Sequence, residues 1–219
     1  MHKLASYTDV RKRIQPGDII AFGGNSLFSR WTKLTTGANV THVALVLETP
    51  RVGINHHFCR HRIIEATRYK RRFGVMLNNL HERITTYPGD VWWLPLNTLA
   101  RQRLDHNHHK FTRYMMAQEH GKYDIWQLFG AAVDISERYP RLRRFAHNKE
   151  DLSSWFCSEL VSAGLREAEV LGHLNASEVT PIDVCRFNIF DKHYIQLKGK
   201  IKKIKDFNSL DPTGWGLHN

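Results

Sequence analysis

A chain of 219 residues has the length of one ordinary domain, and with 42% apolar and 24% charged residues it has the composition of a globular protein. That composition argues against wholesale disorder, and no run approaches the roughly 18 apolar residues that a membrane-spanning helix needs. The net charge of +11 is large for this size. It favours contact with anionic surfaces such as lipid or cell-wall polymer, although a solvated basic surface explains it equally well.

The N-terminal residues contain no apolar stretch that could form the core of a signal peptide. We therefore expect a cytoplasmic chain without a transmembrane segment, unless another system delivers it to the envelope or outside the cell. The cysteines are few and odd in number, which argues against a disulfide framework and leaves room for a free catalytic thiol. They are Cys59, Cys157 and Cys185.

The first half of the chain alternates short strands with turns. A Pro-Gly-Asp turn at 16–18 precedes a buried strand at 19–22, and a helix begins near Ser26 with an apolar stripe. Further strands are predicted from their apolar and β-branched residues. They lie at 41–47, about 59–67, and 91–94.

The second half is richer in helical periodicity. Helices are predicted at 109–120 and 123–133, a polar and basic insertion at 134–152, and another helix from near Ser153. One or two strands follow near 193–204. This order predicts a single α+β domain spanning residues 1–219, with a mostly antiparallel sheet packed against the helix from Ser153.

Cys157 is the first candidate for chemistry, because loop residues give way to helical periodicity just before it. We therefore expect its thiol in the first turn of that helix. Unpaired backbone N–H groups and the positive end of the helix dipole stabilise a thiolate there, and the same groups could hold an oxyanion. The alternative is a small structural cysteine packed under the helix.

His42 opens a strand whose other residues are almost all apolar, an awkward place for an imidazole without a partner. The alternative is a satisfied core or edge histidine. If 41–49 and 58–66 form a symmetric hairpin, Glu65 lies directly opposite His42 with Cβ atoms about 4.5–5.5 Å apart. A carboxylate at that distance orients an imidazole and stabilises its protonated form. Otherwise Glu65 is a surface charge.

The remaining candidates for this chemistry fit less well. Glu48 shares the face of His42 but lies six residues along the strand, roughly 20 Å away at about 3.3 Å per residue. Cys59 would pair with Glu48 at the far end of the hairpin. Cys185 follows a Pro-containing turn, without a helix start to activate its thiol.

Several segments in a fixed order carry a family resemblance: GDIIAF and a Ser-initiated helix, then THVALVL, IIEAT, GKYD, WFCSELV and VTPIDV. Over roughly residues 14–190 the chain resembles the circularly permuted NlpC-type branch of the papain-like superfamily, to which YiiX-like bacterial proteins and the lecithin retinol acyltransferase group belong. In that branch the histidine strand precedes the cysteine helix. The His-rich turn at 55–61 and the basic insertion depart from the compact family pattern.

The resemblance implies a permuted papain-like fold with Cys157 as nucleophile, His42 as base and Glu65 as the orienting residue. Tyr123, in GKYD, matches a tyrosine segment near the family's site. We add Ser158, next to the nucleophile, as a second candidate for substrate or oxyanion binding.

The implied activity is that of a cysteine peptidase or amidase, which cleaves amide bonds of peptides or peptidoglycan fragments through a thioester acyl-enzyme. It requires no cofactor and no metal. The alternative within the same fold is a lipid-directed thiol acyltransferase or esterase, so the expected partner is a peptide, cell-wall or lipid-like acyl substrate. A ligand-binding member without turnover is not favoured, since all three catalytic side chains are present.

Two readings outside this family remain. His57, Cys59 and His61 alternate along a strand and could share a zinc ion, but neighbours on one face are about 6–7 Å apart, which suits two ligands better than three. The basic runs carry some aromatic residues without a recognisable nucleic-acid-binding motif, so we expect no specific nucleic-acid binding. These runs lie at 69–73, 138–145 and 198–206.

Overall fold

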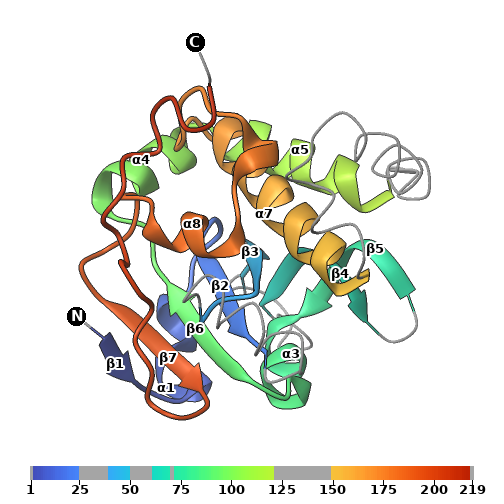
Figure 1. The fold of residues 1–219 in the computed structure, drawn as a ribbon, viewed down its shortest axis with the longest axis vertical. Helices are drawn as coiled ribbons and strands as arrows, with labels where there is room; N and C mark the ends of the chain where they lie inside the picture. Colours follow the sequence, from blue (N-terminus) through green and yellow to red (C-terminus); the bar gives the residue numbers. More distant parts are fainter. Residues whose placement is uncertain (1, 25–38, 50–60, 70–71, 121–148, 218–219) are drawn as a thin grey trace, which may run out of the picture.

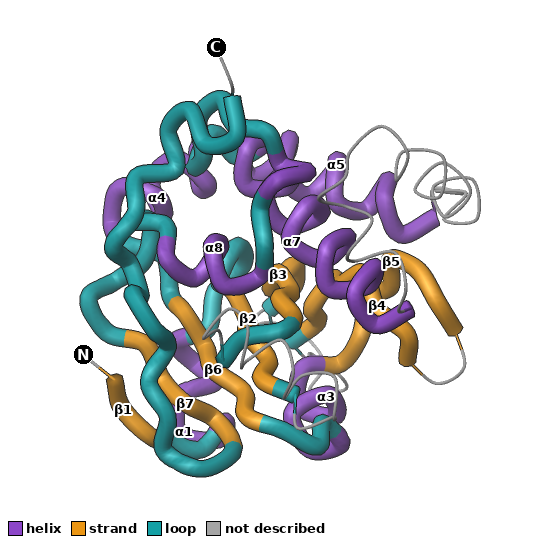
Figure 2. The backbone as a smooth tube through the Cα atoms, in the orientation of Figure 1, coloured by secondary structure: helices purple, strands orange, loops and turns teal. Residues whose placement is uncertain are grey.

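The computed structural model describes residues 2–24, 39–49, 61–69, 72–120 and 149–217. These residues form one seven-stranded sheet with helices on both of its faces, as Figures 1 and 2 show. The predicted α+β class is confirmed. The helices predicted from Ser26 and at 123–133 lie outside the described residues, as does the 134–148 part of the predicted insertion.

The sheet has the strand order β1-β7-β6-β2-β3-β4-β5. Its strands are β1 (His2–Leu4), β2 (Ile19–Gly23), β3 (His42–Glu48), β4 (Arg62–Tyr69), β5 (Arg72–Asn79), β6 (Asp90–Leu94) and β7 (Tyr194–Lys198). All neighbouring strands run antiparallel except the edge pair β1 and β7, which is parallel. The first and last strands of the chain therefore lie side by side at one edge (Figure 1).

The described residues contain six α-helices and two short 3₁₀ turns. They are α1 (Tyr7–Val10), η1 (Arg11–Arg13), α3 (Leu80–Thr86), α4 (Thr98–His106), α5 (His108–His120), α7 (Lys149–Glu167), η3 (Ala176–Glu178) and α8 (Pro181–Arg186). Local sequence explains several starts: Asn79 accepts a hydrogen bond from the Glu82 backbone at the start of α3, and Thr180 and Asp183 form a capping box at α8. No helix within the described ranges is both long and apolar enough to cross a bilayer.

The alternating side chains of the strands build two cores. On one face, residues such as Val43 and Leu45 pack against α4, α5, α7 and α8. On the other face, Ala44 and Val46 pack against α3 and the segment around α1 and η1. His42 has the parity of this second face, because side chains two residues apart along a strand point the same way.

The pairing of β3 with β4 differs from the predicted hairpin. Leu45 lies opposite Ile64 and Val46 opposite Ile63, and a bulge follows before Glu48. The predicted register is therefore wrong by two residues. A shift of two keeps every side chain on its face, so Glu65 moves from directly opposite His42 to a diagonal position on the same face.

The start of α7 also differs from the prediction. The helix begins at Lys149 rather than near Ser153, so Cys157 is its ninth residue. Lys149–Leu152, predicted as the end of a basic insertion, has good helix formers that extend the helix by a turn. Six further strands and helices were missed by the sequence analysis: β1, α1, β5, α3, α4 and α8. Residues 199–204 follow β7 without a second strand.

Candidate active site

His42 stands at the first position of β3 and is only 8% exposed. It pairs with Phe22 of the neighbouring strand β2, and the two ring centroids are 5.4 Å apart. The start of β3 thus places the imidazole against an aromatic ring rather than in solvent.

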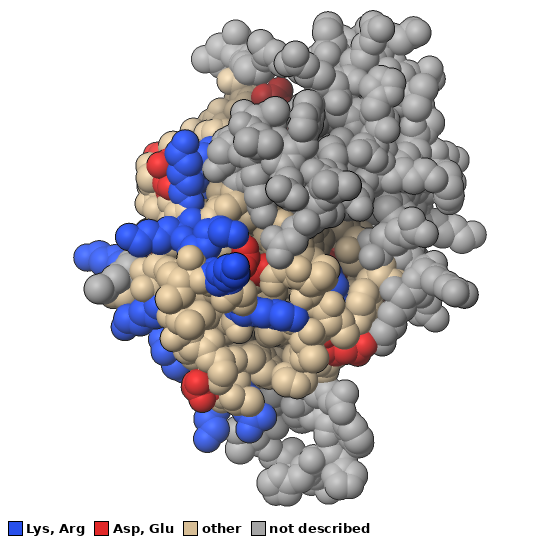
Figure 3. Space-filling model, turned by 60° about the horizontal axis from the view of Figure 1, so that its bottom comes forward, with Lys and Arg blue, Asp and Glu red and all other residues tan. Residues whose placement is uncertain are grey.

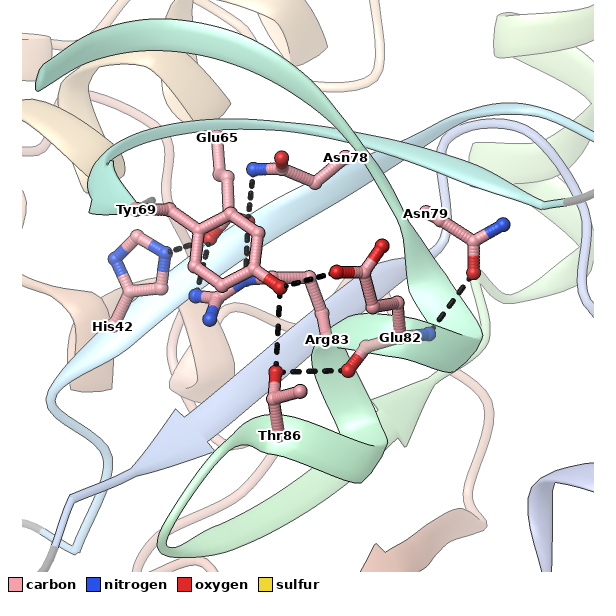
Figure 4. Close-up of polar contacts among 8 residues, drawn as sticks. All are labelled: His42, Glu65, Tyr69, Asn78, Asn79, Glu82, Arg83 and Thr86. Atoms are coloured by element: carbon pink, nitrogen blue, oxygen red, sulfur yellow. Dashed lines mark hydrogen bonds and ion pairs between the residues drawn. The ribbon is translucent and has the colours of Figure 1, made fainter. Parts of the chain in front are cut away.

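Glu65 lies on β4, next to β3, and has no exposed surface. Its Oε2 is 2.7 Å from His42 Nε2 (Figure 4). The contact expected from the sequence is present despite the register error, because a glutamate side chain is long enough to span the diagonal between neighbouring strands.

Two further residues bind the same carboxylate. Oε1 of Glu65 accepts hydrogen bonds from Asn78 Nδ2 at 2.8 Å and from Arg83 Nε at 2.6 Å. Oε2 accepts a third from Arg83 Nη2 at 2.9 Å, so the guanidinium holds Glu65 with a two-pronged contact (Figure 4). Such a fork fixes both the position and the rotation of the carboxylate.

Arg83 is itself held by a cage of aromatic rings. It is 6% exposed, and its guanidinium carbon lies 5.2 Å from the Phe22 ring centroid, 4.7 Å from that of Tyr69 and 5.7 Å from that of Tyr87. The Tyr69 hydroxyl donates to Glu82 Oε1 at 2.8 Å, which ties the cage to α3. Cations are attracted to aromatic faces, so these rings limit the positions open to Arg83.

The charges of the cluster follow from these contacts. Burial by itself raises the pKa of Glu65, but the hydrogen bonds and positive charges of His42 and Arg83 outweigh it and lower the pKa to about 2. Burial by itself lowers the pKa of His42. The negative charge and hydrogen bond of Cys157, together with those of Glu65, raise it to about 9. At neutral pH the cluster therefore favours a carboxylate beside an imidazolium.

Cys157 is fully buried in the core that α7 forms with the sheet, and it acts on His42 through both charge and a hydrogen bond. Because Glu65 occupies Nε2, the imidazole nitrogen left for the thiol is Nδ1. Transfer of the thiol proton to His42 turns a neutral pair into a thiolate–imidazolium pair without changing the net charge. Arg83 and Glu65 cancel each other in either state, so the transfer adds no uncompensated charge to the interior.

The expected activation of Cys157 by a helix N-terminus is wrong. As the ninth residue of α7, Cys157 lies in the helix interior, where backbone N–H groups bond to the carbonyl four residues earlier. These groups are therefore committed and form neither a thiolate-stabilising end nor an oxyanion hole. The group that interacts with this thiol is the His42 imidazole, not the end of a helix.

The other sequence candidates fall elsewhere. The Ser158 hydroxyl is buried and donates to the Val179 carbonyl at 2.5 Å, which joins α7 to the segment before α8. Glu48 pairs with Arg62 at 3.1 Å on a partly exposed part of the sheet. Cys185 is buried, and burial raises the pKa of its thiol. Tyr123 lies outside the described residues.

Of the three residues proposed to bind zinc, the structure describes one, His61. His57 and Cys59 lie outside the described part of the chain, while Nδ1 of His61 is 2.8 Å from the Tyr7 hydroxyl. Among the described residues, no three histidine, cysteine or carboxylate side chains come together as a metal-binding group.

Arg83 and Asn78 were missed by the sequence analysis. The signal for Arg83 was present, because Leu80 and Ile84 mark the apolar face of a short helix and Arg83, three residues after Leu80, falls on it. A buried arginine on an apolar face demands an anionic partner. No comparable signal singles out Asn78.

Comparison of the sequence with known proteins found no match, so the proposed function rests on the geometry of this site. No protein-family model matches the chain, and no curated protein matches it in sequence. The described residues define an α+β protein with a buried cluster of cysteine, histidine, glutamate and arginine.

Proposed function

We propose that the chain is a cysteine-dependent hydrolase with a permuted papain-like fold, in which Cys157 is the nucleophile, His42 the base and Glu65 the orienting residue. The proposal is carried by the 2.7 Å contact between His42 Nε2 and Glu65 Oε2, together with the charge and hydrogen bond of Cys157 that raise the pKa of the same imidazole. This three-part arrangement is the general form of an activated nucleophile.

The order of the elements supports the permuted arrangement. The histidine strand β3 precedes the cysteine helix α7 in the chain, and α7 packs directly against β3 and β4. His42 and Glu65 come from these two strands and Cys157 from the helix, so elements that pack directly on one another supply the three side chains. A site built on packed strands and a helix is held more firmly than one built on loops.

The first half of the proposed reaction forms an acyl-enzyme. The Cys157 thiolate attacks the carbonyl carbon of an amide, and the carbonyl π electrons move to oxygen. Collapse of this tetrahedral species breaks the C–N bond, and His42 gives its proton to the departing amine. The products are a thioester on Cys157 and a free amine.

The second half regenerates the thiol. Neutral His42 takes a proton from water as the water oxygen attacks the thioester carbon, and the C–S bond breaks to release a carboxylic acid and the thiolate. Glu65 stabilises the imidazolium formed in each half, and it stays ionised throughout because Arg83 and Asn78 bind it. Amides in peptides or cell-wall fragments are the proposed substrates.

The proposal is tested by the alkylation of Cys157 with iodoacetamide at pH 6, read residue by residue by mass spectrometry. A free cysteine is only about 0.3% thiolate at this pH, so an ion pair with His42 should accelerate labelling roughly 100-fold over the His42→Ala variant. Cys185 is the internal control, because it is equally buried but has no histidine partner in the cluster.

Labelling of Cys157 at the rate of Cys185, or a rate indifferent to His42→Ala, would contradict the proposal. Hydrolytic activity provides a second test of the same proposal. The native chain should release acetate from an activated acetate ester, and Cys157→Ala should not, whereas Cys185→Ala should retain the activity.

A further inference from the structure

The turn after β7 displays an isoleucine to solvent between lysines. Residues 198–203 read Lys-Gly-Lys-Ile-Lys-Lys, and Ile201 is 75% exposed. Lys200 and Lys203 are exposed beside it. Single exposed apolar residues are common on proteins, so what matters is whether this one belongs to a larger, fixed feature.

The turn is held in place by a fully buried side chain. Gln196 has no exposed surface; its Nε2 donates to the carbonyls of Lys198 at 3.1 Å and Lys200 at 2.7 Å, and its Oε1 accepts from the Lys202 backbone at 2.9 Å. Gly199 has a φ of +99°, which only glycine adopts readily. The exposure of Ile201 is therefore built into a rigid turn.

Two lysines of the turn anchor it rather than point to solvent. The Lys198 ammonium donates to the backbone carbonyls of Ile84, Thr85 and Tyr87 at 2.7–2.8 Å, at the end of α3. Lys202 pairs with Asp90 at 2.7 Å. Asp90, the acidic neighbour of the turn, is thus already neutralised, and the charges of Lys200 and Lys203 face outward.

The edge strand β1 adds to the same surface. Leu4, which is 57% exposed, lies opposite Gln196 in the β1/β7 pairing, so it adjoins the residue that holds the turn. His2 of β1 stacks on Tyr194 of β7 with ring centroids 5.1 Å apart, and the Tyr194 hydroxyl accepts a hydrogen bond from the backbone of Ile204, the residue after Lys203, at 2.8 Å. Figure 3, turned so that the bottom of Figure 1 comes forward, shows Lys and Arg side chains gathered on the left part of the described surface, with some acidic side chains among them.

We propose that Leu4 and Ile201, with Lys200 and Lys203, form a docking surface for an anionic lipid bilayer. The aliphatic side chains would enter the boundary between headgroups and acyl chains, and the lysines would lie among the anionic headgroups. Nucleic acid fits the patch less well, because exposed aliphatic side chains have no partner on a phosphate backbone and are not the aromatic rings on which single-stranded bases stack.

The docking surface borders a hollow of about 520 Å³ lined by residues 87–90 and by the turn. Tyr87 belongs to both this hollow and the aromatic cage, since its ring lies 4.9 Å from Phe22, which contacts His42. The hollow is therefore lined both by residues of the docking turn and by a residue of the aromatic cage beside the candidate active site. The proposal itself does not depend on catalysis.

Vesicle sedimentation tests it with the full chain. The native protein should bind vesicles of mixed phosphatidylglycerol and phosphatidylcholine. It should bind vesicles of phosphatidylcholine alone much more weakly. Ile201→Ser and Leu4→Ser should each lower the partition coefficient about ten-fold, because each removes a buried aliphatic side chain from the bound state. Leu99→Ser is the matched control, because Leu99 is also 57% exposed but lies on α4.

The charges are tested in the same way. Lys200→Gln with Lys203→Gln should weaken binding roughly 25-fold, about five-fold for each lysine at the surface. The control pair Lys110→Gln with Lys192→Gln removes the same net charge elsewhere and should change binding no more than roughly two-fold. All these positions are exposed, and unchanged thermal melts will show that the variants fold.

Binding that is indifferent to Ile201→Ser and Leu4→Ser would overturn the proposal and leave only general attraction between opposite charges. So would an absence of vesicle binding, or binding to DNA in its place. Cys157→Ala should bind vesicles like the native chain, so failure of the docking surface and failure of the proposed hydrolase are distinguished.

Discussion

Two buried carboxylates of this protein, Glu65 and Asp18, have nearly the same burial but opposite electrostatics. Each is at most 1% exposed and each is paired with an arginine. Yet the pKa of Glu65 is lowered to about 2, whereas burial raises the pKa of Asp18 to about 6 despite the favourable charge of Arg101.

The difference between the two pKa values comes from the hydrogen-bond donors around each carboxylate. Asp18 accepts hydrogen bonds from Trp93 Nε1 at 2.8 Å, from the backbone N–H groups of Gln15 and Leu96, and from a single nitrogen of Arg101. Three of these four donors are neutral, so they satisfy the oxygens without contributing a full positive charge. The site connects the turn before β2 with β6 and α4, which is an architectural role.

Glu65 instead meets two cations, the guanidinium of Arg83 through two bonds and the imidazolium of His42 through one. Burial disfavours any ionised group, and of these two carboxylates the one with two charged partners is the one whose pKa is lowered. The number of cationic donors therefore separates a carboxylate that can stabilise an imidazolium from one that stabilises a chain crossing.

The largest expected effect on activity comes from replacing each of the two carboxylates by its neutral amide. Glu65→Gln should lower the esterase activity about 10³-fold, because a neutral amide cannot stabilise the His42 imidazolium. Asp18→Asn is the matched control, with the same change of chemistry and burial, and should keep activity within about three-fold. The measurement is the esterase rate of each variant, normalised to its folded fraction. Equal losses of activity in the two variants would show that Glu65 has only a structural role.

Glu65 and Asp18 should make the stability of the protein depend on pH with opposite signs. The pKa of Glu65 falls from its ordinary 4.5 to about 2, so its contribution is present in full above pH 4.5 and is lost as the pH falls toward 2. The pKa of Asp18 rises from 3.8 to about 6, so its contribution is present below pH 3.8 and is lost as the pH rises through 6. Each amounts to roughly 3 kcal/mol, at about 1.4 kcal/mol per pKa unit.

Urea unfolding of the native chain, Glu65→Gln and Asp18→Asn between pH 3 and pH 8 measures both contributions. Asp18→Asn should flatten the decline in stability between pH 4 and pH 6, and Glu65→Gln should flatten the rise between pH 3 and pH 4.5. A decline between pH 4 and pH 6 that persists in Asp18→Asn would assign it to another group.

The smallest effect concerns the arginines. Arg83→Lys keeps the positive charge but cannot reproduce the two-pronged contact, so it should lower activity about ten-fold through looser positioning of Glu65. Arg101→Lys makes the corresponding change beside Asp18 and should leave activity unchanged. Both should lose about 1 kcal/mol of stability. A loss of stability without a loss of activity in Arg83→Lys would limit Arg83 to a packing role.

The sequence alone was sufficient for the class of the fold and for the contact between His42 and Glu65. Strand side chains alternate with a period of two, so even a register error of two residues left both groups on one face. The stripe of apolar residues after Cys157 likewise predicted the helix that packs on β3 and β4. The catalytic roles of these residues stay predictions.

Only the tertiary structure showed how the site is held and charged. The start of α7 places Cys157 in a helix interior, so its thiol lies beside the His42 imidazole and away from the end of the helix. Arg83 reaches Glu65 across 18 positions of the chain, through the missed strand β5 and helix α3. Local periodicity specifies which way a side chain faces, but burial and the donors around it come from segments distant in sequence. The opposite charge preferences of Glu65 and Asp18 therefore arise only in the folded chain.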